Sequence, residues 1–222
     1  KVYFPAGEET EEGVDVLAEV DPAIIPAMKL KIGEMKVGAE HFGRWQLETE
    51  PQLRGVQVKN INGRFRNMDI AGELGWEFDQ EKHYSWFKST KLTAKNMKDV
   101  LKSWKMDPSV ESKKAKFTSD ISWQGSPLAF NFETLSGSGS VDIRDGRFIA
   151  DAQTGALKIF GMLNFNSITR RLKLDFSDLY ESGLSYDEVK GSFVVNDGLM
   201  HIQKPMVIDG PGGKFQTVGK IN

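Results

Sequence analysis

Three histidines are the first residues to test for chemistry in this chain. His41 and His201 lie in alternating, strand-like patterns, and His83 lies beside a charged turn. None of them has a second histidine three or four residues away, so neither an HExxH-type zinc site nor a two-histidine facial triad is indicated. We therefore expect ordinary surface or groove histidines and no metal site.

Two further patterns resemble catalytic motifs, and each lacks a defining residue. The serine run 137–140 has no glycine two places after its second serine, which a GxSxG nucleophile elbow requires. The loop 210–214, GPGGK, resembles a phosphate-binding loop, but Phe215 replaces the magnesium-binding Ser or Thr and Ile208 replaces the first glycine. Paired acids have no third partner that would assign an acid and a base; they are Asp175 with Asp178 and Asp187 with Glu188. We expect no catalytic residue, no cofactor and no enzyme.

Charge and composition narrow the class of protein. The chain has 222 residues, with 29 lysines and arginines against 31 acids, so its formal net charge is −2. This balance creates no basic field, and we expect no nucleic-acid partner. The absence of cysteine fits a reducing cytosol and a periplasm equally well. No apolar stretch is long enough to span a bilayer, and the start at Lys1 without a signal-peptide pattern indicates a piece of a longer protein.

Alternating apolar and polar residues predict that most of the chain forms β-strands. We expect roughly fourteen to sixteen short strands, which are too many for one ordinary sandwich and favour a long, curved antiparallel sheet. The expected strands include 14–18, 28–32, 84–93, 117–123, 128–132 and a pair turned at Asp145-Gly146.

Helical spacing occurs at two places. Met97, Val100, Leu101 and Trp104 fall at i, i+3, i+4 and i+7, and Pro108 follows as a terminator. The second helix is expected near 154–164, and the residues that would pack against the sheet or plug its groove are Leu157, Phe160 and Leu163.

The first of these helices is amphipathic and cationic. Nine lysines against three acids between Lys88 and Lys116 leave a local charge of about +6. The lysines that lie away from the apolar stripe are Lys95, Lys98, Lys102 and Lys105. They form either a solvated face or a contact for anionic headgroups or a membrane surface.

Two distant segments share one spacing of glycines and apolar residues. Segment 55–65 follows the pattern G-V-x-V-x-x-I-x-G-x-F, and segment 183–193 follows G-L-x-Y-x-x-V-x-G-x-F. One such unit cannot bury its own apolar face, whereas stacked copies extend a single sheet. The repeat therefore favours an elongated molecule.

Apolar side chains on successive strands mark one common face of the expected sheet. That face is either the sealed core of a sandwich or the floor of an open hydrophobic groove, and the sequence leaves both open. In a groove, each lipid methylene removed from water contributes roughly 0.8 kcal/mol. The candidate lipid-binding residues are Leu30, Trp45, Leu47, Leu74, Trp76, Phe78, Ile121, Trp123, Leu128, Phe130, Phe132 and Phe193.

A family resemblance covers roughly residues 135–214. The run ALKIFGMLNFNSITRRLKLDFSDL, followed by GLSYDEVKGSFVVNDGLM and VIDGPGGK, resembles the C-terminal region of the AsmA-like envelope proteins, most closely their YhdP branch. The resemblance implies a long β-groove that carries phospholipid across the periplasm between inner and outer membranes, held by an inner-membrane anchor outside this chain. We accordingly expect a β-groove segment at 1–134 and an AsmA-like C-terminal segment at 135–222.

Two other functions fit the same residues. A closed β-sandwich serving adhesion or envelope assembly would bury the aromatic residues and take up no lipid. A glycan-binding sandwich would instead expose tryptophans such as Trp76 or Trp86 on a polar face.

Overall fold

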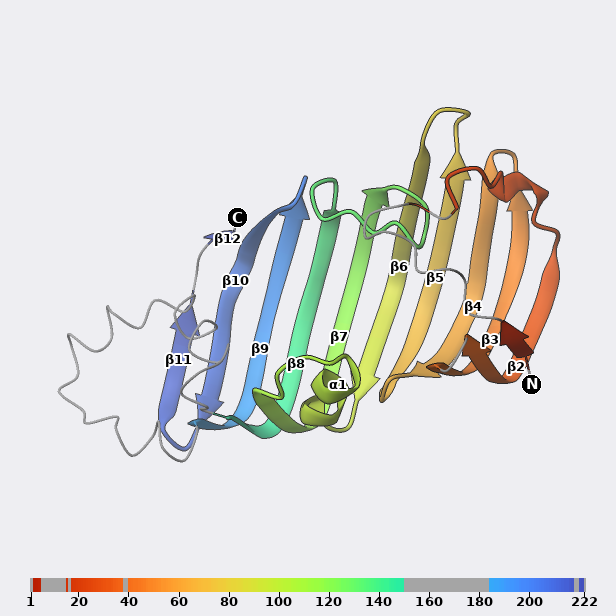
Figure 1. The fold of residues 1–222 in the computed structure, drawn as a ribbon. Coiled ribbons are helices and arrows are strands. Elements are labelled where there is room, and N and C mark those ends of the chain that lie inside the picture. Colours follow the sequence, from red (N-terminus) through yellow and green to blue (C-terminus); the bar gives the residue numbers. More distant parts are fainter. Residues whose placement is uncertain are drawn as a thin grey trace.

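A single sheet contains every strand of the part of the chain that the structure describes. The computed structural model describes residues 2–4, 15, 17–37, 40–149, 184–217 and 220–221. Their 12 strands lie in the order β1 to β11, with β12 beside β10, so strands adjacent in the chain are adjacent in space (Figure 1). β1 pairs with β2 in parallel, and all other pairs are antiparallel.

The sheet consists mostly of long strands, and two short helical segments connect some of them. The strands are β1 (Val2–Phe4), β2 (Met28–Val37), β3 (Glu40–Gln52), β4 (Gly55–Phe65), β5 (Met68–Phe78), β6 (His83–Ala94), β7 (Val110–Gln124), β8 (Ser136–Phe148), β9 (Leu184–Asn196), β10 (Leu199–Gly210), β11 (Gly213–Thr217) and β12 (Lys220–Ile221). The helical segments are the 3-10 turn η1 (Pro22–Ile24) and the α-helix α1 (Met97–Ser103).

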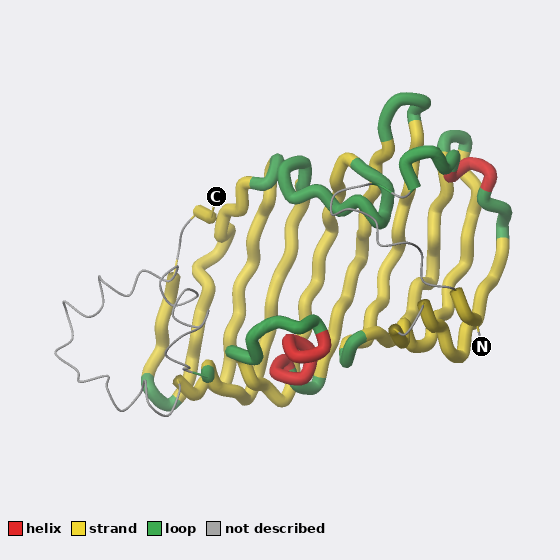
Figure 2. The backbone as a smooth tube through the Cα atoms, in the orientation of Figure 1, coloured by secondary structure: helices red, strands yellow, loops and turns green. Residues whose placement is uncertain are grey.

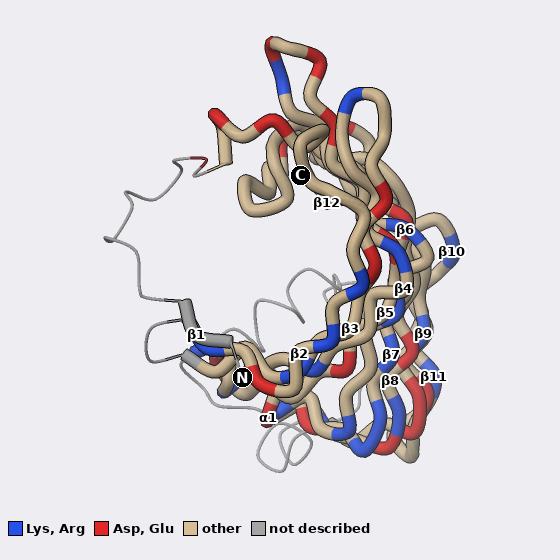
Figure 3. Tube along the Cα trace, turned by 90° about the vertical axis from the view of Figure 1, so that its right-hand side faces the viewer, with Lys and Arg blue, Asp and Glu red and all other residues tan. Residues whose placement is uncertain are grey.

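The sheet is curved across its strands and open on one side. In Figure 3 the strands follow an arc, and the described residues place no second sheet opposite its inner side. Helices, turns and loops lie mainly at the two ends of the strands (Figure 2). The expected elongated, curved antiparallel sheet is confirmed, and the described residues form no two-sheet sandwich. We call the inner side of the arc the concave face and the outer side the convex face.

Bulges interrupt the pairing near the middle of β4, β6 and β10. Each of these strands holds extra residues relative to its neighbours, within 58–61, 87–90 and 202–207. Asn60 and Ser89, with φ of 53° and 50°, lie inside the first two bulges. Because a bulge adds one residue and bends the strand, residues three apart across it share a face and the sheet curves.

The two ends of the strands carry different elements. We name the helix rim as the end with α1 and the turn 66–67. The loop rim is the opposite end, with η1, the turns 53–54 and 79–82, and the loop 125–135. α1 lies over the concave face at the helix rim, and its spacing-based prediction is confirmed (Figure 1).

Two expected strands are wrong because local side-chain hydrogen bonds form turns instead. Residues 128–132 belong to the loop 125–135, where the Asn131 carboxamide oxygen accepts from Glu133 N at 2.8 Å. Residues 17–19 form a turn, where the Asp15 carboxylate accepts from Leu17 N at 3.0 Å. Asn and Asp side chains compete in this way with a strand ladder.

The expected turn at Asp145-Gly146 is also wrong. β8 continues through both residues, because β7 and β9 keep one register with it on either side, although φ of Asp145 is 52°. The segments 199–203 and 206–209 likewise form one strand, β10, because bulges there mask a continuous ladder. Within the described residues, such mergers replace two expected short strands by one longer strand.

Two further expectations from the sequence stay predictions. The second expected helix, with Leu157, Phe160 and Leu163, lies outside the described residues. The division at 134/135 is likewise untested, while the sheet itself continues across that point through the pairing of β7 with β8.

Candidate functional site

Strand β5 shows most simply how the sheet separates apolar from polar side chains. Met68 packs against the cluster under α1, which assigns it to the concave face. Side chains alternate along a strand, so residues two apart share that face. The concave residues of β5 are Met68, Ile70, Gly72, Leu74, Trp76 and Phe78, and the convex ones are Asp69, Ala71, Glu73, Gly75 and Glu77.

The pairing registers extend this separation across the sheet. Leu74 lies opposite Val58 on one side and Phe87 on the other, and Phe87 lies opposite Ile121. When the paired residues are counted from strand to strand, with allowance for the extra residue at each bulge, they form one apolar strip along the middle of the concave face. The floor residues in this strip include Leu30, Ile32, Leu47, Val58, Ile61, Ile70, Leu74, Phe87, Leu92, Phe117, Ile121, Val141, Phe193 and Ile202.

The convex face is polar by the same count. Ion pairs join neighbouring strands there, such as Lys29 with Glu48 at 3.3 Å and Arg144 with Glu188 at 3.1 Å. The sheet therefore has one face suited to water and one suited to hydrocarbon.

Burial is concentrated at the rims and not along the floor. The floor side chains are half-buried, and Leu30 is 37% exposed. Near the loop rim, by contrast, Trp76 and Trp123 are only 5% and 6% exposed, and near the helix rim Ala115 is fully buried. The described residues therefore leave an apolar strip uncovered between two packed rims, which together form an open groove.

Aromatic rings lie close against glycines at several points of this groove. A Cβ atom on Gly63 would overlap the ring of Trp45, and one on Gly139 would meet the ring of Phe193 at 2.5 Å. The glycines thus leave room for the rings to lie against the backbone, which keeps them out of the groove. The convex face has one such pair, in which the ring of Trp86 covers Gly75 and occupies the corresponding Cβ position.

Hydrogen bonds to buried side chains hold the loop rim together. His83 Nδ1 accepts from Trp76 Nε1 at 3.0 Å, so its Nε2 carries the proton and donates to the Ala18 carbonyl at 2.8 Å. Phe78 stacks on the same imidazole, with ring centroids 4.4 Å apart. Histidine-mediated bonding thus ties the segment after residue 17 to β5 and β6.

A second polar contact holds the same segment to the loop 125–135. The Asp15 carboxylate accepts from Ser126 Oγ at 2.6 Å and from Ser126 N at 3.2 Å. Burial acts to raise the pKa of Asp15, but the bonds from Ser126 and Leu17 outweigh it and leave that pKa below its ordinary value. Residues 17–27 therefore form a strap that crosses the loop rim from β7 back to β2.

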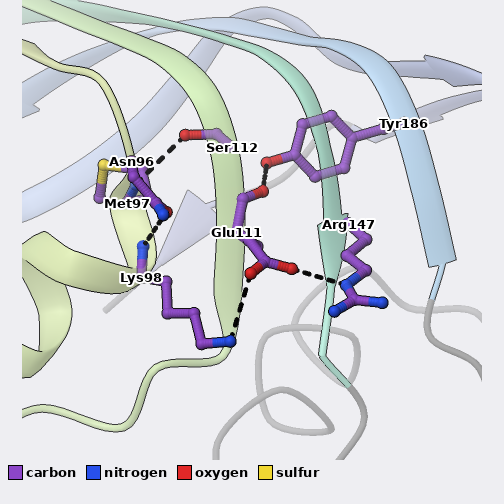
Figure 4. Close-up of polar contacts among 7 residues, drawn as sticks. All are labelled: Asn96, Met97, Lys98, Glu111, Ser112, Arg147 and Tyr186. Atoms are coloured by element: carbon purple, nitrogen blue, oxygen red, sulfur yellow. Dashed lines mark hydrogen bonds and ion pairs between the residues drawn. The ribbon is translucent and has the colours of Figure 1, made fainter.

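Helix α1 and a network of charged residues hold the helix rim (Figure 4). The Ser112 hydroxyl accepts from Met97 N at 3.2 Å, and Glu111 pairs with Arg147 at 2.7 Å and with Lys98 at 3.2 Å. The Arg147 guanidinium, followed by the Lys98 ammonium, holds the pKa of Glu111 below its usual range. The Tyr186 hydroxyl donates to the Glu111 carbonyl at 2.7 Å, and burial raises the pKa of Tyr186.

The sequence-predicted groove residues lie in three different settings. Leu30, Leu47, Leu74, Ile121 and Phe193 belong to the floor, and Trp45 covers Gly63 beside them. Trp76, Phe78 and Trp123 pack beneath the loop rim. Leu128, Phe130 and Phe132 project from the loop 125–135, with exposed fractions of 70%, 41% and 73%.

The four lysines singled out in the sequence differ in whether they have an ion-pair partner. Lys98 is engaged by Glu111, whereas Lys95, Lys102 and Lys105 are exposed and have no carboxylate partner among the described residues. Their proposed contact with headgroups stays a prediction.

Sequence reasoning missed several floor residues on the bulged strands. Phe87 and Leu92 lie five apart in β6, a spacing that breaks simple alternation, because the bulge near Ser89 adds one residue between them. The signal that could have found them is the spacing of three between apolar residues, as in Val58 and Ile61, which marks a bulge in β4.

The described residues contain neither a membrane-spanning helix nor a cluster of metal-ligating side chains. Within the described ranges, no helix is long and apolar enough to cross a membrane. The same residues contain no group of three or more His, Cys, Asp or Glu side chains placed to hold a metal ion.

A single-layered, curved sheet with an apolar concave face places the chain among groove-forming β proteins. The sequence model of the family described as YhdP protein matches residues 1–222, and the chain belongs to the YhdP family. It is similar to the intermembrane phospholipid transporter YhdP of Escherichia coli (strain K12), with 27% identity over 104 residues, which cover 46% of this chain and 8% of that protein. No solved structure matches the chain.

Proposed function

We propose that the concave face holds the acyl chains of phospholipids, and that this chain is one stretch of a longer, inner-membrane-anchored protein that carries phospholipid through the periplasm between the two membranes. The observation that supports this most strongly is the apolar floor, which crosses the sheet from β2 to β10 and is left half-buried by the described residues. Membership of the YhdP family supports phospholipid as the cargo.

The energetics favour hydrocarbon on this floor. Each methylene that leaves water contributes roughly 0.8 kcal/mol, so an acyl chain of a dozen or more carbons gains on the order of 10 kcal/mol. In this proposal the headgroup remains at the open side of the groove, and the exposed lysines Lys95, Lys102 and Lys105 at the helix rim attract its phosphate. Carriage of this kind needs no catalytic residue.

Photo-crosslinking at adjacent residues tests which face meets lipid. A photoreactive phenylalanine analogue replaces Ile121, on the floor, or Ser122, the next residue and on the convex face. We expect phospholipid adducts, identified by mass spectrometry of protein crosslinked in cells, at Ile121 and not at Ser122. Equal labelling at both positions, or none at Ile121 and at Phe117, would favour a structural envelope module that takes up no lipid.

The glycine-aromatic pairs provide a second test, which asks whether filling the groove with an aromatic ring displaces phospholipid. Gly139→Val pushes the Phe193 ring into the groove, whereas Gly75→Val displaces Trp86 on the convex face. Both changes crowd a ring, and the closer approach of the ring at Gly75 than at Gly139 should make the convex control at least as destabilising as Gly139→Val. Only Gly139→Val should reduce the phospholipid that copurifies with the protein, measured by native mass spectrometry. Equal lipid content in both variants would contradict the groove assignment.

A further inference from the structure

The motif SGSGS at the start of β8 has a role that the groove does not explain. Its glycines, Gly137 and Gly139, lie on the concave face, where Phe193 covers the second. Its serines, Ser136, Ser138 and Ser140, therefore lie on the convex face. Small polar side chains in the middle of that face leave it hollowed between neighbouring strands.

Two connected hollows occupy this part of the convex face. One, of about 440 Å³, is lined by Lys91, Asp120 and Ser138 among others, and the next, of about 360 Å³, by Lys190, Ser192 and Lys204 among others. Lys116, Thr118 and Ser140 line both. The bulged part of β10 supplies one wall, through Gln203, Lys204 and Pro205. We call the pair the convex hollow.

Three lysines of the convex hollow have no counterion among the described residues. Lys91, Lys116 and Lys204 have no carboxylate within ion-pairing distance among the described residues. The two carboxylates that line the hollow are already engaged: Asp120 accepts from Ser89 N at 2.6 Å, and Asp142 is held by Arg144 at 2.8 and 3.1 Å. Because four lysines and only two carboxylates line the hollow, the site is cationic toward an incoming ligand.

Hydroxyl groups at the base of the convex hollow add hydrogen-bonding capacity. Thr118 Oγ1 and Ser140 Oγ lie 2.7 Å apart, and the buried Ser192 Oγ has no hydrogen-bond partner among the described residues. A buried hydroxyl without a partner is uncommon and indicates a missing ligand atom or solvent. The hollow thus offers three ammonium groups and three hydroxyls as donors. A carboxylate ligand would present two oxygens to them, whereas a phosphate presents three terminal oxygens and so suits the site better.

We propose that the convex hollow binds the phosphate ester of a polyol, with the phosphate held by Lys116 and Lys204 and the hydroxyl-bearing body placed along Ser138 and Ser140. The volume of the hollow exceeds that of a bare phosphate, and the hydroxyls of Ser138 and Ser140 suit a glycerol or sugar body. Such an ester is available as a free molecule or as the headgroup of a glycerophospholipid at a membrane surface, and the site lies on the opposite face from the groove.

Titration of the 222-residue chain with defined probes tests this site. The probes are inorganic phosphate, glycerol 1-phosphate and vesicles of phosphatidylglycerol, and the readouts are backbone amide shifts and vesicle cosedimentation. We expect saturable shifts at Thr118, Ser140 and Ser192, with the ester binding more tightly than inorganic phosphate. Saturation by the free ester identifies a soluble ligand, whereas saturation by the vesicles alone identifies a lipid headgroup.

Matched lysine variants decide whether the binding is specific. Lys116→Gln should weaken ester or vesicle binding by about tenfold, because it removes a charge-assisted hydrogen bond. Lys31→Gln removes an exposed lysine on the same face, in β2, and should leave binding unchanged. The proposal is overturned if no probe saturates, or if the two variants weaken binding equally. Lipid held in the groove, measured by native mass spectrometry, should be the same in both variants, which separates this test from that of the proposed function.

Discussion

The helix rim buries apolar residues beneath α1 and exposes lysines, with Trp104 and Met106 exposed at 39% and 59% just after the helix, whereas the loop rim exposes several large apolar residues more fully. At the helix rim Val100 is 4% exposed beneath α1. At the loop rim Leu53 is 95% exposed, Ile24 74% and Phe132 73%. The same strands therefore end in two rims of different chemistry.

This comparison indicates how each rim is held. The helix rim is stabilised by hydrophobic burial under α1, supported by ion pairs around Glu111. The loop rim depends more on hydrogen bonds, from His83 to Ala18 of the strap and from Ser126 of the loop 125–135 to Asp15 just before the strap. Because a net hydrogen bond contributes only about 1 kcal/mol, the strap should open more readily than α1.

The largest effect is expected from a charge placed under α1. Val100→Asp buries an unpaired carboxylate against Ala94 and Ala115, so the free energy of unfolding should fall by at least about 3 kcal/mol. Urea denaturation measures this loss. Leu53→Asp, at an exposed position of the loop rim, should change stability by less than about 0.5 kcal/mol. Similar losses in both variants would remove the distinction between the rims.

The second-largest effect is expected on membrane binding, to which the helix-rim lysines should contribute more than other exposed lysines. The triple change of Lys95, Lys102 and Lys105 to Gln removes three charges, each of which contributes about 1 kcal/mol at an anionic surface, so affinity for phosphatidylglycerol vesicles should fall roughly 100-fold. Cosedimentation at fixed salt measures it. A control with Lys29, Lys31 and Lys82 changed to Gln has the same net charge, and an equal loss there would show nonspecific attraction only.

The strap provides an intermediate effect. His83→Phe keeps an aromatic ring beside Phe78 but leaves the buried Trp76 Nε1 without an acceptor, so stability should fall by about 1–3 kcal/mol. Amide exchange at residues 17–20 should accelerate at the same time. His41→Phe, at a side chain 63% exposed, is the matched control and should affect neither quantity. Unchanged exchange in His83→Phe would mean that the strap is held by other contacts.

The smallest effect concerns pH at the helix rim. The pKa of Glu111 lies below its ordinary value of 4.5, chiefly because of Arg147 and then Lys98. Its contribution to stability is therefore present above pH 4.5 and is lost as the pH falls through the lowered value. Glu111→Gln should flatten the decline of unfolding free energy in that acidic range. Glu77→Gln, on the convex face, should leave the decline unchanged.

Regular strands and the first helix could be predicted from local spacing alone. β5 alternates without interruption, so Leu74, Trp76 and Phe78 could be assigned to one face before the structure was known. The 97–104 spacing similarly located α1. In these segments a single periodicity applies throughout, and side-chain burial follows it.

The rest depended on residues that break the period. The bulge near Ser89 shifts half of β6 relative to the other, so Phe87 and Leu92 could not be recognised as one face. The loop around Asn131 was mistaken for a strand because apolar residues alternate there without joining a ladder. Whether the floor is covered depends on tertiary arrangement, which alternation does not encode.

The bulges also constrain how these strands can change in length. Removal of the extra residue Asn60 would restore regular pairing with Val58 and Ile61 still on the concave face. Removal of one residue from an unbulged strand such as β5 would instead turn the side chains beyond it through the sheet, so apolar groups would meet solvent and charged groups would enter the groove. Two-residue insertions or deletions preserve the orientation of everything beyond them. We therefore expect related sequences to gain or lose single residues at the bulges and to vary in strand length by even steps elsewhere.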